Sequence, residues 1–489
     1  MLPRLITLLL VLAGVLRATA PDRPNIIFIL ADDLGLGDVA CTGSDRYQTP
    51  HLDTLARGGT TFRHAYAVPL CGPSRATILT GRYLFRTGAT NQDATGRFTP
   101  QAEMMTPAVL KQAGYVSSSI GKWGQLPLGP KDFGFDDYLR FSGSGAYWKS
   151  QGRKGESVEI NGRRVPVGDH EYIPDLMHTH LVDFITRNRE RPFFVYYSLS
   201  HVHTDILPTP DSAPGSTTLY ADNIAYMDKL VGKLANELDR LRLRERTLIV
   251  FFGDNGTSEG KAETSTVGGR SLNGAKGSML EGGSRVPLVV NWPGVVPAGR
   301  FSTDLIDCSD FLPTFAELAG APLPAGKVID GRSFASQLRG RNEPGRDWIF
   351  IQLARRWYVA DRHWKLNQAG ELFDLSDAPF TEKAVASSNA SPAATQRASA
   401  ASCAAIILPR RCDSSPIVRF LYSFAADAGS NIARSIALNT TSSLAKSASA
   451  SLTSRLSLAC ASRAAAAVFL SSLRSAFDTF SFAGPLPRM

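Results

Sequence analysis

Two pairs of polar residues could together bind a metal ion. Asp32 and Asp33 form one pair and Asp254 and Asn255 the other, and each pair directly follows a continuous apolar run. Three carboxylates and an amide oxygen suit a hard divalent cation, Ca²⁺ or Mg²⁺, rather than zinc. Either pair alone is more often an ordinary turn or helix cap. The sequence therefore predicts a metal site only if the fold brings the two pairs together.

A cysteine precedes a short helical pattern that could bind an anion. Cys71-Gly-Pro-Ser-Arg75 opens a helix-like stretch that reaches Thr80 and stops at Gly81. Position 71 would lie at the helix N-terminus, where the helix dipole favours negative charge. Arg75, one turn later, would lie on the same side. The alternative is a buried structural cysteine.

Basic and imidazole groups occur in three further loops. Lys122 lies in Gly-Lys-Trp-Gly, Lys276 lies in Gly-Ala-Lys-Gly, and His201 and His203 form a His-x-His pair. Taken singly, each lysine is more often a solvated surface group and each histidine an ordinary loop residue. Their significance depends on the elements that position them.

Those elements predict an α/β fold. Continuous apolar runs rich in β-branched or aromatic residues indicate buried strands, and an amphipathic pattern lies between the last two. A strand, a helix and a strand in succession favour a βαβ unit in a sheet covered on both faces, with ligands beyond the carboxyl ends of the strands. The predicted strands are residues 25–31, 115–120, 192–198 and 247–252, and the predicted helices are residues 106–113 and 217–241.

The chain also divides into regions of different composition. Short aromatic segments separated by charged turns predict a small antiparallel sheet formed by residues 348–352, 357–360, 364–367 and 371–375. We expect a large central mixed or mostly parallel sheet flanked by helices, with this smaller sheet C-terminal to it. The expected divisions are a signal peptide (1–20), a catalytic domain (21–335), a small subdomain (336–385) and an Ala/Ser-rich tail (386–489).

The N-terminus has the pattern of an export signal. Arg4 precedes about a dozen apolar residues, and Ala18-Thr-Ala20 matches a signal-peptidase site. The apolar stretch is too short to span a bilayer, and no later stretch is long and apolar enough. We expect an exported protein, periplasmic or extracellular, without stable membrane insertion.

Charge and composition exclude some classes of protein. The net charge of +9 comes mostly from residues 391–489, which contain ten Lys/Arg and three Asp/Glu. The remaining body is near neutral and has no basic stripe of the kind a nucleic-acid-binding protein needs. The same residues include 23 Ala and 20 Ser and lack the aromatic and branched residues of a packed core. We expect an aberrant extension, with a natural Ala/Ser-rich appendage as the alternative. Six cysteines in 489 residues do not form a disulfide framework.

The motifs together resemble the type I sulfatases of the alkaline-phosphatase-like superfamily. The resemblance spans about residues 24–380. It rests on Asp32-Asp-Leu-Gly-Leu-Gly-Asp38, Thr49-Pro-His-Leu-Asp53, Cys71-Gly-Pro-Ser-Arg75 with Thr80-Gly-Arg82, Gly121-Lys-Trp123, Gly253-Asp-Asn-Gly256, Gly277-Ser-Met-Leu-Glu-Gly-Gly283 and Asp330-Gly331.

The resemblance implies a secreted hydrolase of sulfate esters, of a sulfated carbohydrate or an aryl sulfate. Cys71 would be oxidised by a formylglycine-generating enzyme, and its hydrate would be the nucleophile. One hydroxyl would attack sulfur and the other would re-form the aldehyde, which releases sulfate. Asp32, Asp33, Asp254, Asn255 and residue 71 would ligate Ca²⁺, with Mg²⁺ as the alternative. Arg75 would orient the hydrate, Lys122 and Lys276 would contact the sulfate oxygens, and His203, rather than His201, would assist the nucleophile or the leaving group.

One position departs from the family pattern. The family often has a histidine two residues after the lysine of Gly-Lys-Trp, where this chain has Gly124, followed by Gln125. A proton donor or substrate-binding group is therefore absent or supplied from elsewhere.

Three other functions remain open on the sequence. A phosphate or phosphonate ester hydrolase could use the same groups. A thiol hydrolase with a Cys71–His203 dyad would leave the metal-ligand residues unexplained. A non-catalytic binding protein would keep Cys71 unmodified.

Overall fold

The computed structural model describes residues 23–92, 98–124 and 126–385. All of them belong to one compact unit within Met1–Ser415. The predicted signal peptide and the Ala/Ser-rich tail lie outside the described residues, as does Gln125.

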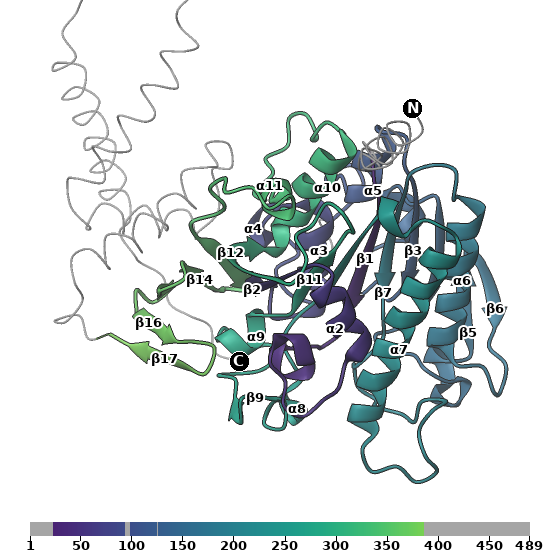
Figure 1. The fold of residues 1–489 in the computed structure, drawn as a ribbon, viewed down its shortest axis with the longest axis horizontal. Helices are drawn as coiled ribbons and strands as arrows, with labels where there is room; N and C mark the ends of the chain where they lie inside the picture. Colours follow the sequence, from purple (N-terminus) through teal and green to yellow (C-terminus); the bar gives the residue numbers. More distant parts are fainter. Residues whose placement is uncertain (1–22, 93–97, 125, 386–489) are drawn as a thin grey trace, which may run out of the picture. The chain divides into compact units, whose positions relative to one another are not determined.

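A ten-stranded mixed sheet forms the centre of this unit (Figure 1). Four parallel neighbours, in the order β8-β1-β7-β3, form its middle. They are β1 (Asn25–Ala31), β3 (Val116–Gly121), β7 (Phe193–Ser198) and β8 (Thr247–Gly253). The prediction of buried parallel strands is confirmed for β1, β7 and β8, and the further strand predicted at residues 115–120 is β3. The outer strands, some parallel and some antiparallel to their neighbours, are β2 (Thr60–Tyr66), β4 (Asp137–Phe141), β5 (Ser157–Ile160), β6 (Arg163–Pro166), β11 (Leu288–Asn291) and β12 (Arg300–Asp307).

Helices cover both faces of the sheet, which explains why β1 is apolar throughout. Ile27 and Ile29 pack in a core with helices on one face, while Phe28 packs on the other, where its ring lies 4.7 Å from that of Phe311. The first face carries α2 (Pro50–Arg57), α6 (Ile173–Arg187) and α7 (Leu219–Arg240). The second carries α3 (Cys71–Thr80), α4 (Leu84–Thr87), α5 (Thr106–Lys111), α10 (Phe311–Ala319) and α11 (Ala335–Leu338). The predicted helices correspond to α5 and α7.

A second sheet of five antiparallel strands follows, as expected from its aromatic segments. Its strands are β13 (Ile349–Leu353), β14 (Arg356–Ala360), β15 (Trp364–Asn367), β16 (Leu372–Asp377) and β17 (Thr381–Ala384). Strand β17 was not predicted from the sequence, because Thr-Glu-Lys-Ala has no apolar alternation. Figure 1 shows α9 (Glu281–Ser284) beside this sheet, and a hydrogen bond joins Glu281 to Glu382 of β17.

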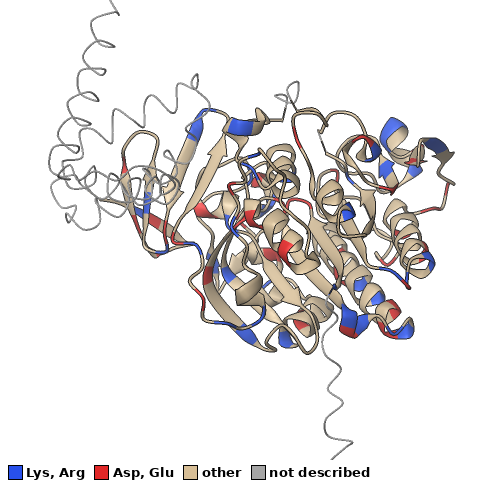
Figure 2. Ribbon diagram, turned by 90° about the horizontal axis from the view of Figure 1, so that it is seen from above, with Lys and Arg blue, Asp and Glu red and all other residues tan. Residues whose placement is uncertain are grey.

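The charges of the described residues are interspersed. Figure 2 shows basic and acidic positions scattered among each other over the ribbon. In the part of the chain that the structure describes, no helix combines the length and apolar character needed to cross a membrane.

Candidate active site

The polar residues predicted to do chemistry follow the four central strands. Asp32 follows β1, Asp254 follows β8, Lys122 follows β3 and His203 lies in the loop after β7. Because the strands are parallel neighbours, their carboxyl ends lie at one edge of the sheet. Both Asp32 and Asp254 are fully buried there.

An unusual backbone conformation makes the adjacent carboxylates converge. Asp33 has φ of 60°, in the left-handed region that non-glycine residues seldom adopt outside turns and functional sites. Its backbone N–H donates to Asp254 Oδ1 over 3.1 Å. Carboxylate oxygens of Asp32 and Asp33 and a ring nitrogen of His203 lie within 4.8 Å of one another. The kink therefore directs both carboxylates toward one point.

Arg75 connects three of the strand ends. Its guanidinium is fully buried and donates to Asp254 Oδ2 through Nη2 at 2.7 Å and Nε at 3.1 Å. Its Nη1 donates to the carbonyl of Lys122 at 3.0 Å and to the hydroxyl of Ser198. Charge-assisted bonds of this kind fix both partners firmly. Arg75 thus links α3 to the carboxyl ends of β3, β7 and β8 through hydrogen bonds.

Cys71 is the first residue of α3 and is 1% exposed. Its Sγ lies within 4.8 Å of oxygens of Asp32 and Asp254. Gln92 contacts the same position: its Nε2 donates to Cys71 Sγ at 3.1 Å, and its Oε1 accepts from the N–H of Gly72 at 2.9 Å. Cys71, Cys41 and Cys308 are all free thiols, so in the described chain Cys71 has no disulfide partner.

Two lysines pair with the two adjacent carboxylates. Lys122 Nζ lies 2.6 Å from Asp32 Oδ2, and both groups are fully buried. Lys276 Nζ lies 2.6 Å from Asp33 Oδ1. Burial alone would lower the pKa of Lys276, but the negative groups around it, Asp33 first, together outweigh burial and raise the pKa. Both lysines therefore bring a positive charge to the edge of the sheet.

The two histidines of the His-x-His pair lie in different surroundings. His203 lies beside Asp33 and Lys276, and burial, with Lys122 nearby, lowers its pKa to about 4. His201 is fully buried among tyrosines, and its Nε2 is 2.9 Å from the hydroxyl of Tyr172. Burial lowers the pKa of His201 to about 3. Only the ring of His203 faces the cluster.

The donor set fits a divalent cation. Oδ1 of Asp32 and Oδ1 of Asn255 are buried oxygens without a hydrogen-bond partner among the described residues. Burial raises the pKa of the Asp32 carboxyl to about 8. A cation beside these oxygens would satisfy both of them and would offset the cost of burying the carboxylate. The residues present thus suit Ca²⁺ or Mg²⁺.

Two residues that contact the site, Ser198 and Gln92, were not predicted from the sequence. Ser198 ends β7 at the same edge as the metal-type ligands, so its position at a strand end could have indicated it. Gln92 lies in a loop without a recognisable pattern, and only the tertiary structure brings it to Cys71. Asn255-Gly-Thr257 also matches a glycosylation sequon, but Asn255 and Thr257 are both buried in the structure.

The chain matches the sequence models of two known families. The sequence model of the sulfatase family matches residues 24–321. The chain belongs to the sulfatase family. A second model, described as N-sulphoglucosamine sulphohydrolase, C-terminal, matches residues 275–393. The chain is accordingly a sulfuric ester hydrolase.

Characterised sulfatases of mammals are similar over most of their length. N-acetylgalactosamine-6-sulfatase of Canis lupus familiaris is 35% identical over 367 residues, which covers 68% of this chain and 70% of the relative. Steryl-sulfatase of Mus musculus is 31% identical and covers 71% of each chain.

Solved structures confirm the fold. Ps i-CgsB, crystallised with k-i-k-neocarrahexaose, has a TM-score of 0.65 and 30% identity, and the match covers 75% of this chain and 89% of that chain. A 6S-sulfatase described from bacteroides thetaiotaomicron glycosaminoglycan metabolism has a TM-score of 0.66 and 26% identity, with 77% and 98% covered. The alkaline-phosphatase-like sheet and the smaller sheet predicted from the sequence are thus confirmed.

The glycine that departs from the family pattern adjoins Arg75. Gly124 has φ of +79°, and a Cβ at this position would lie 3.0 Å from Arg75 Cδ. A side chain here would be strained and would press on the arginine that holds Asp254. In this sulfatase, therefore, a histidine cannot simply be restored at position 124.

Proposed function

We propose that this sulfatase hydrolyses the sulfate ester of a sulfated saccharide. Residue 71 would act as formylglycine, and Ca²⁺, or alternatively Mg²⁺, would bind beside it. The single observation that supports this most strongly is the position of Cys71, at the start of α3 and within 4.8 Å of carboxylate oxygens of Asp32 and Asp254. A nucleophile beside a cation site is what attack on an anionic ester requires.

The metal ligands are proposed to be Asp32, Asp33, Asp254, Asn255 and residue 71. A cation bound there would neutralise charge on the sulfate oxygens and would lower the pKa of a hydroxyl ligand. Arg75 would fix residue 71 and Asp254 relative to each other, because it hydrogen-bonds Asp254 and lies one helical turn after Cys71 in α3.

The two lysines and His203 complete the proposed machinery. Lys122 and Lys276 would bind the sulfate oxygens, since each places an ammonium group against the acidic cluster. His203 would move a proton to or from the nucleophile or the leaving group, because its ring lies beside Asp33 and burial keeps it neutral near pH 7.

The saccharide preference is supported by the relatives. The dog enzyme is named for a sulfated amino sugar, the second family model is named for a sulphated glucosamine, and Ps i-CgsB was crystallised with a carrageenan-type oligosaccharide. An aryl or steroid sulfate is the second candidate substrate, because steryl-sulfatase is also a relative. We further propose export through residues 1–20, maturation by a formylglycine-generating enzyme, and a domain boundary near residue 335.

The test is sulfate release from a panel of sulfated saccharides and a chromogenic aryl sulfate, measured by ion chromatography. The protein is made with a formylglycine-generating enzyme and Ca²⁺, and phosphate release from matched phosphate esters is measured in parallel. We expect sulfate release, with a sulfated saccharide as the best substrate. Phosphate release without sulfate release would contradict the proposal, and so would a better rate on every aryl sulfate than on any saccharide.

Replacement of the two histidines should have opposite consequences. We expect His203→Ala to lower kcat by about 10²-fold or more, the usual loss for a proton-transferring group. His201→Phe should leave kcat within about threefold but should lower the free energy of unfolding by about 1–3 kcal/mol, because the buried Tyr172 hydroxyl loses its partner. Steady-state kinetics and urea unfolding of both variants check this. A larger loss of kcat in His201→Phe than in His203→Ala would reverse the assignment.

A further inference from the structure

The loop that carries Lys276 has almost no regular structure of its own. Residues 273–281, here called the lysine loop, run from the short strand β10 (Arg270–Ser271) to the first residue of α9. From the large sheet's side, the loop is held by two backbone bonds, Lys276 N–H to Thr257 O at 2.9 Å and Gly277 N–H to Pro69 O at 2.7 Å. The body also contacts two side chains of the loop, since Lys276 pairs with Asp33 and the Tyr66 hydroxyl of β2 donates to Glu281 Oε2 at 3.1 Å. The second sheet adds a further set of bonds.

A buried ion pair of the second sheet holds the C-terminal part of the lysine loop. Lys365 of β15 donates from Nζ to the carbonyl of Met279 at 2.5 Å and to Glu382 Oε2 at 2.7 Å. Glu382 of β17 accepts the backbone N–H of Glu281 through Oε1 at 2.8 Å. The side chains of Lys365 and Glu382 are 3% and 1% exposed. Each member of the pair thus bonds the other member and one backbone group of the loop.

Two more residues of the second sheet bond the loop. Arg356 of β14 donates to the carbonyl of Gly277 at 3.0 Å, next to the lysine itself. The carbonyl of Pro379, between β16 and β17, accepts the N–H of Asn273 at 2.8 Å. The second sheet therefore bonds the lysine loop at its start, beside Lys276 and at its end.

The ion pair is a costly way to stabilise a fold. Burying two charges costs several kcal/mol per ion, and a buried pair seldom contributes more to stability than apolar residues of the same volume. What this pair does specifically is fix the position of the lysine loop, because both charged groups bond backbone atoms of that loop. The position of Lys276 Nζ, 2.6 Å from Asp33, depends on that loop.

We propose that Lys365 and Glu382 are positioning residues that fix Lys276 in the active site, so that the second sheet is needed for binding the sulfate group. The inference rests on the proposed role of Lys276. Strands β15 and β17 would thus support substrate binding without contacting the substrate, through the position of Lys276.

The main experiment is a double-mutant cycle between Lys365 and Lys276. The variants Lys365→Met, Lys276→Ala and the double variant are prepared in the matured, metal-loaded protein, and kcat and KM are measured with a chromogenic aryl sulfate. We expect Lys365→Met to raise KM about tenfold or more with kcat within about threefold, since it displaces a group that binds the substrate. In the Lys276→Ala background, the same substitution should change kcat/KM by less than about twofold. Lys365→Arg, which keeps the charge and the donors, should stay within about threefold of the wild type.

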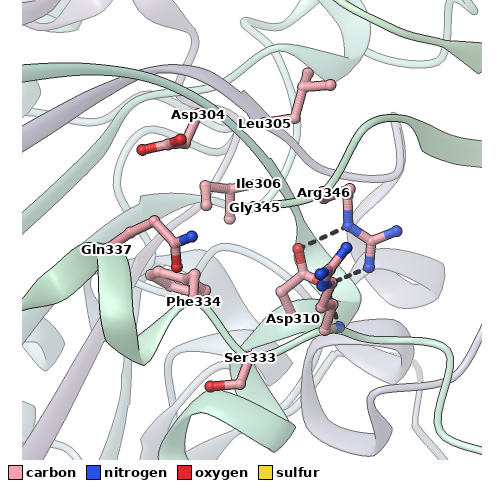
Figure 3. Close-up of a pocket in the computed structure, with 10 residues that line it drawn as sticks. Asp304, Leu305, Ile306, Asp310, Ser333, Phe334, Gln337, Gly345 and Arg346 are labelled. Atoms are coloured by element: carbon pink, nitrogen blue, oxygen red, sulfur yellow. Dashed lines mark hydrogen bonds and ion pairs between the residues drawn. The ribbon is translucent and has the colours of Figure 1, made fainter. Parts of the chain in front are cut away.

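The matched control is another buried ion pair beside the second sheet. Figure 3 shows Arg346 and Asp310 facing each other in a small pocket, where Arg346 Nε donates to Asp310 at 3.0 Å. Arg346 also bonds Tyr83 and the carbonyl of Asp330, which belong to other segments than the lysine loop. We expect Arg346→Met to lower stability but to change kcat/KM by the same factor with and without Lys276.

The outcomes separate the two proposals. If Lys276→Ala leaves KM and kcat unchanged, the proposed role of Lys276 is wrong and the positioning inference falls with it. If Lys276→Ala impairs the enzyme but Lys365→Met acts equally in both backgrounds, only the positioning inference is wrong. Should Lys365→Met fail to fold, Lys365→Met/Glu382→Leu removes both buried charges and serves in the same cycle.

Discussion

Cys71→Ala is expected to lower kcat by at least about 10⁴-fold, because it removes the atom that becomes the proposed nucleophile. The substitution should leave the bound metal largely in place, since Asp32, Asp33, Asp254 and Asn255 are unchanged. The thiol's one hydrogen-bond partner among the described side chains is Gln92 Nε2 at 3.1 Å, and Gln92 stays held because its Oε1 accepts the N–H of Gly72. Sulfate release and the calcium content of the purified variant measure both effects.

Cys308→Ala is the control for this substitution. Cys308 is also a free thiol and 1% exposed, but it lies in the short helix before α10 and, unlike Cys71, does not group with Asp32 and Asp254. It should keep kcat within about threefold and lose only stability. A mass spectrum of the wild-type peptide containing residue 71 should show the aldehyde. Activity of Cys71→Ala equal to that of Cys308→Ala would refute the mechanism.

Asp254→Ala is expected to lower metal content, rate and stability together. Asp254 accepts two bonds from the buried Arg75 and one from the backbone N–H of Asp33. Its removal would leave the buried guanidinium without a hydrogen-bonded carboxylate, because its other ion-pair partner, Asp32, is 3.9 Å away, and breaking a buried pair costs about 3–5 kcal/mol. It would also remove a proposed ligand, so we expect kcat to fall by at least about 10³-fold. Calcium content by plasma mass spectrometry, unfolding in urea and steady-state rates report these losses.

Two further variants interpret this result. Asp254→Asn keeps an oxygen for the Asp33 N–H, and should fold better than the alanine variant while still binding metal weakly. Asp211→Asn removes an exposed carboxylate that pairs with Lys229, and should change stability by less than about 1 kcal/mol and the rate not at all. Unchanged metal occupancy in both Asp254 variants would contradict the ligand assignment.

Long apolar patterns predicted the fold well. The run at residues 25–31 is β1 without a change of boundary, and the pattern at 217–241 is α7 with two residues fewer at its start and one at its end. Burial on both faces forces such a strand to be apolar at every position, so the signal is strong. Strand β17 was missed because its stability comes from pairing with β16 and from Glu382, neither of which leaves an apolar pattern.

The sequence by itself determined which residue types were available for chemistry and which strand ends would present them. Polar residues that follow parallel strands must lie at one edge of a sheet, and this rule favoured a meeting of the Asp32–Asp33 and Asp254–Asn255 pairs. The roles predicted for Lys122 and His203 came from the family resemblance. The motif spacing around Cys71 also placed this residue correctly at the start of a helix.

Only the tertiary structure decided how these groups meet. The left-handed conformation of Asp33, the contact of Gln92 with Cys71 and the separation of His203 from His201 depend on packing between segments distant in the chain. The hydrogen bonds between the second sheet and the lysine loop join residues about 80 to 100 positions apart. Contacts of this kind have no periodicity along the sequence, since they form only when separate elements are brought together by folding.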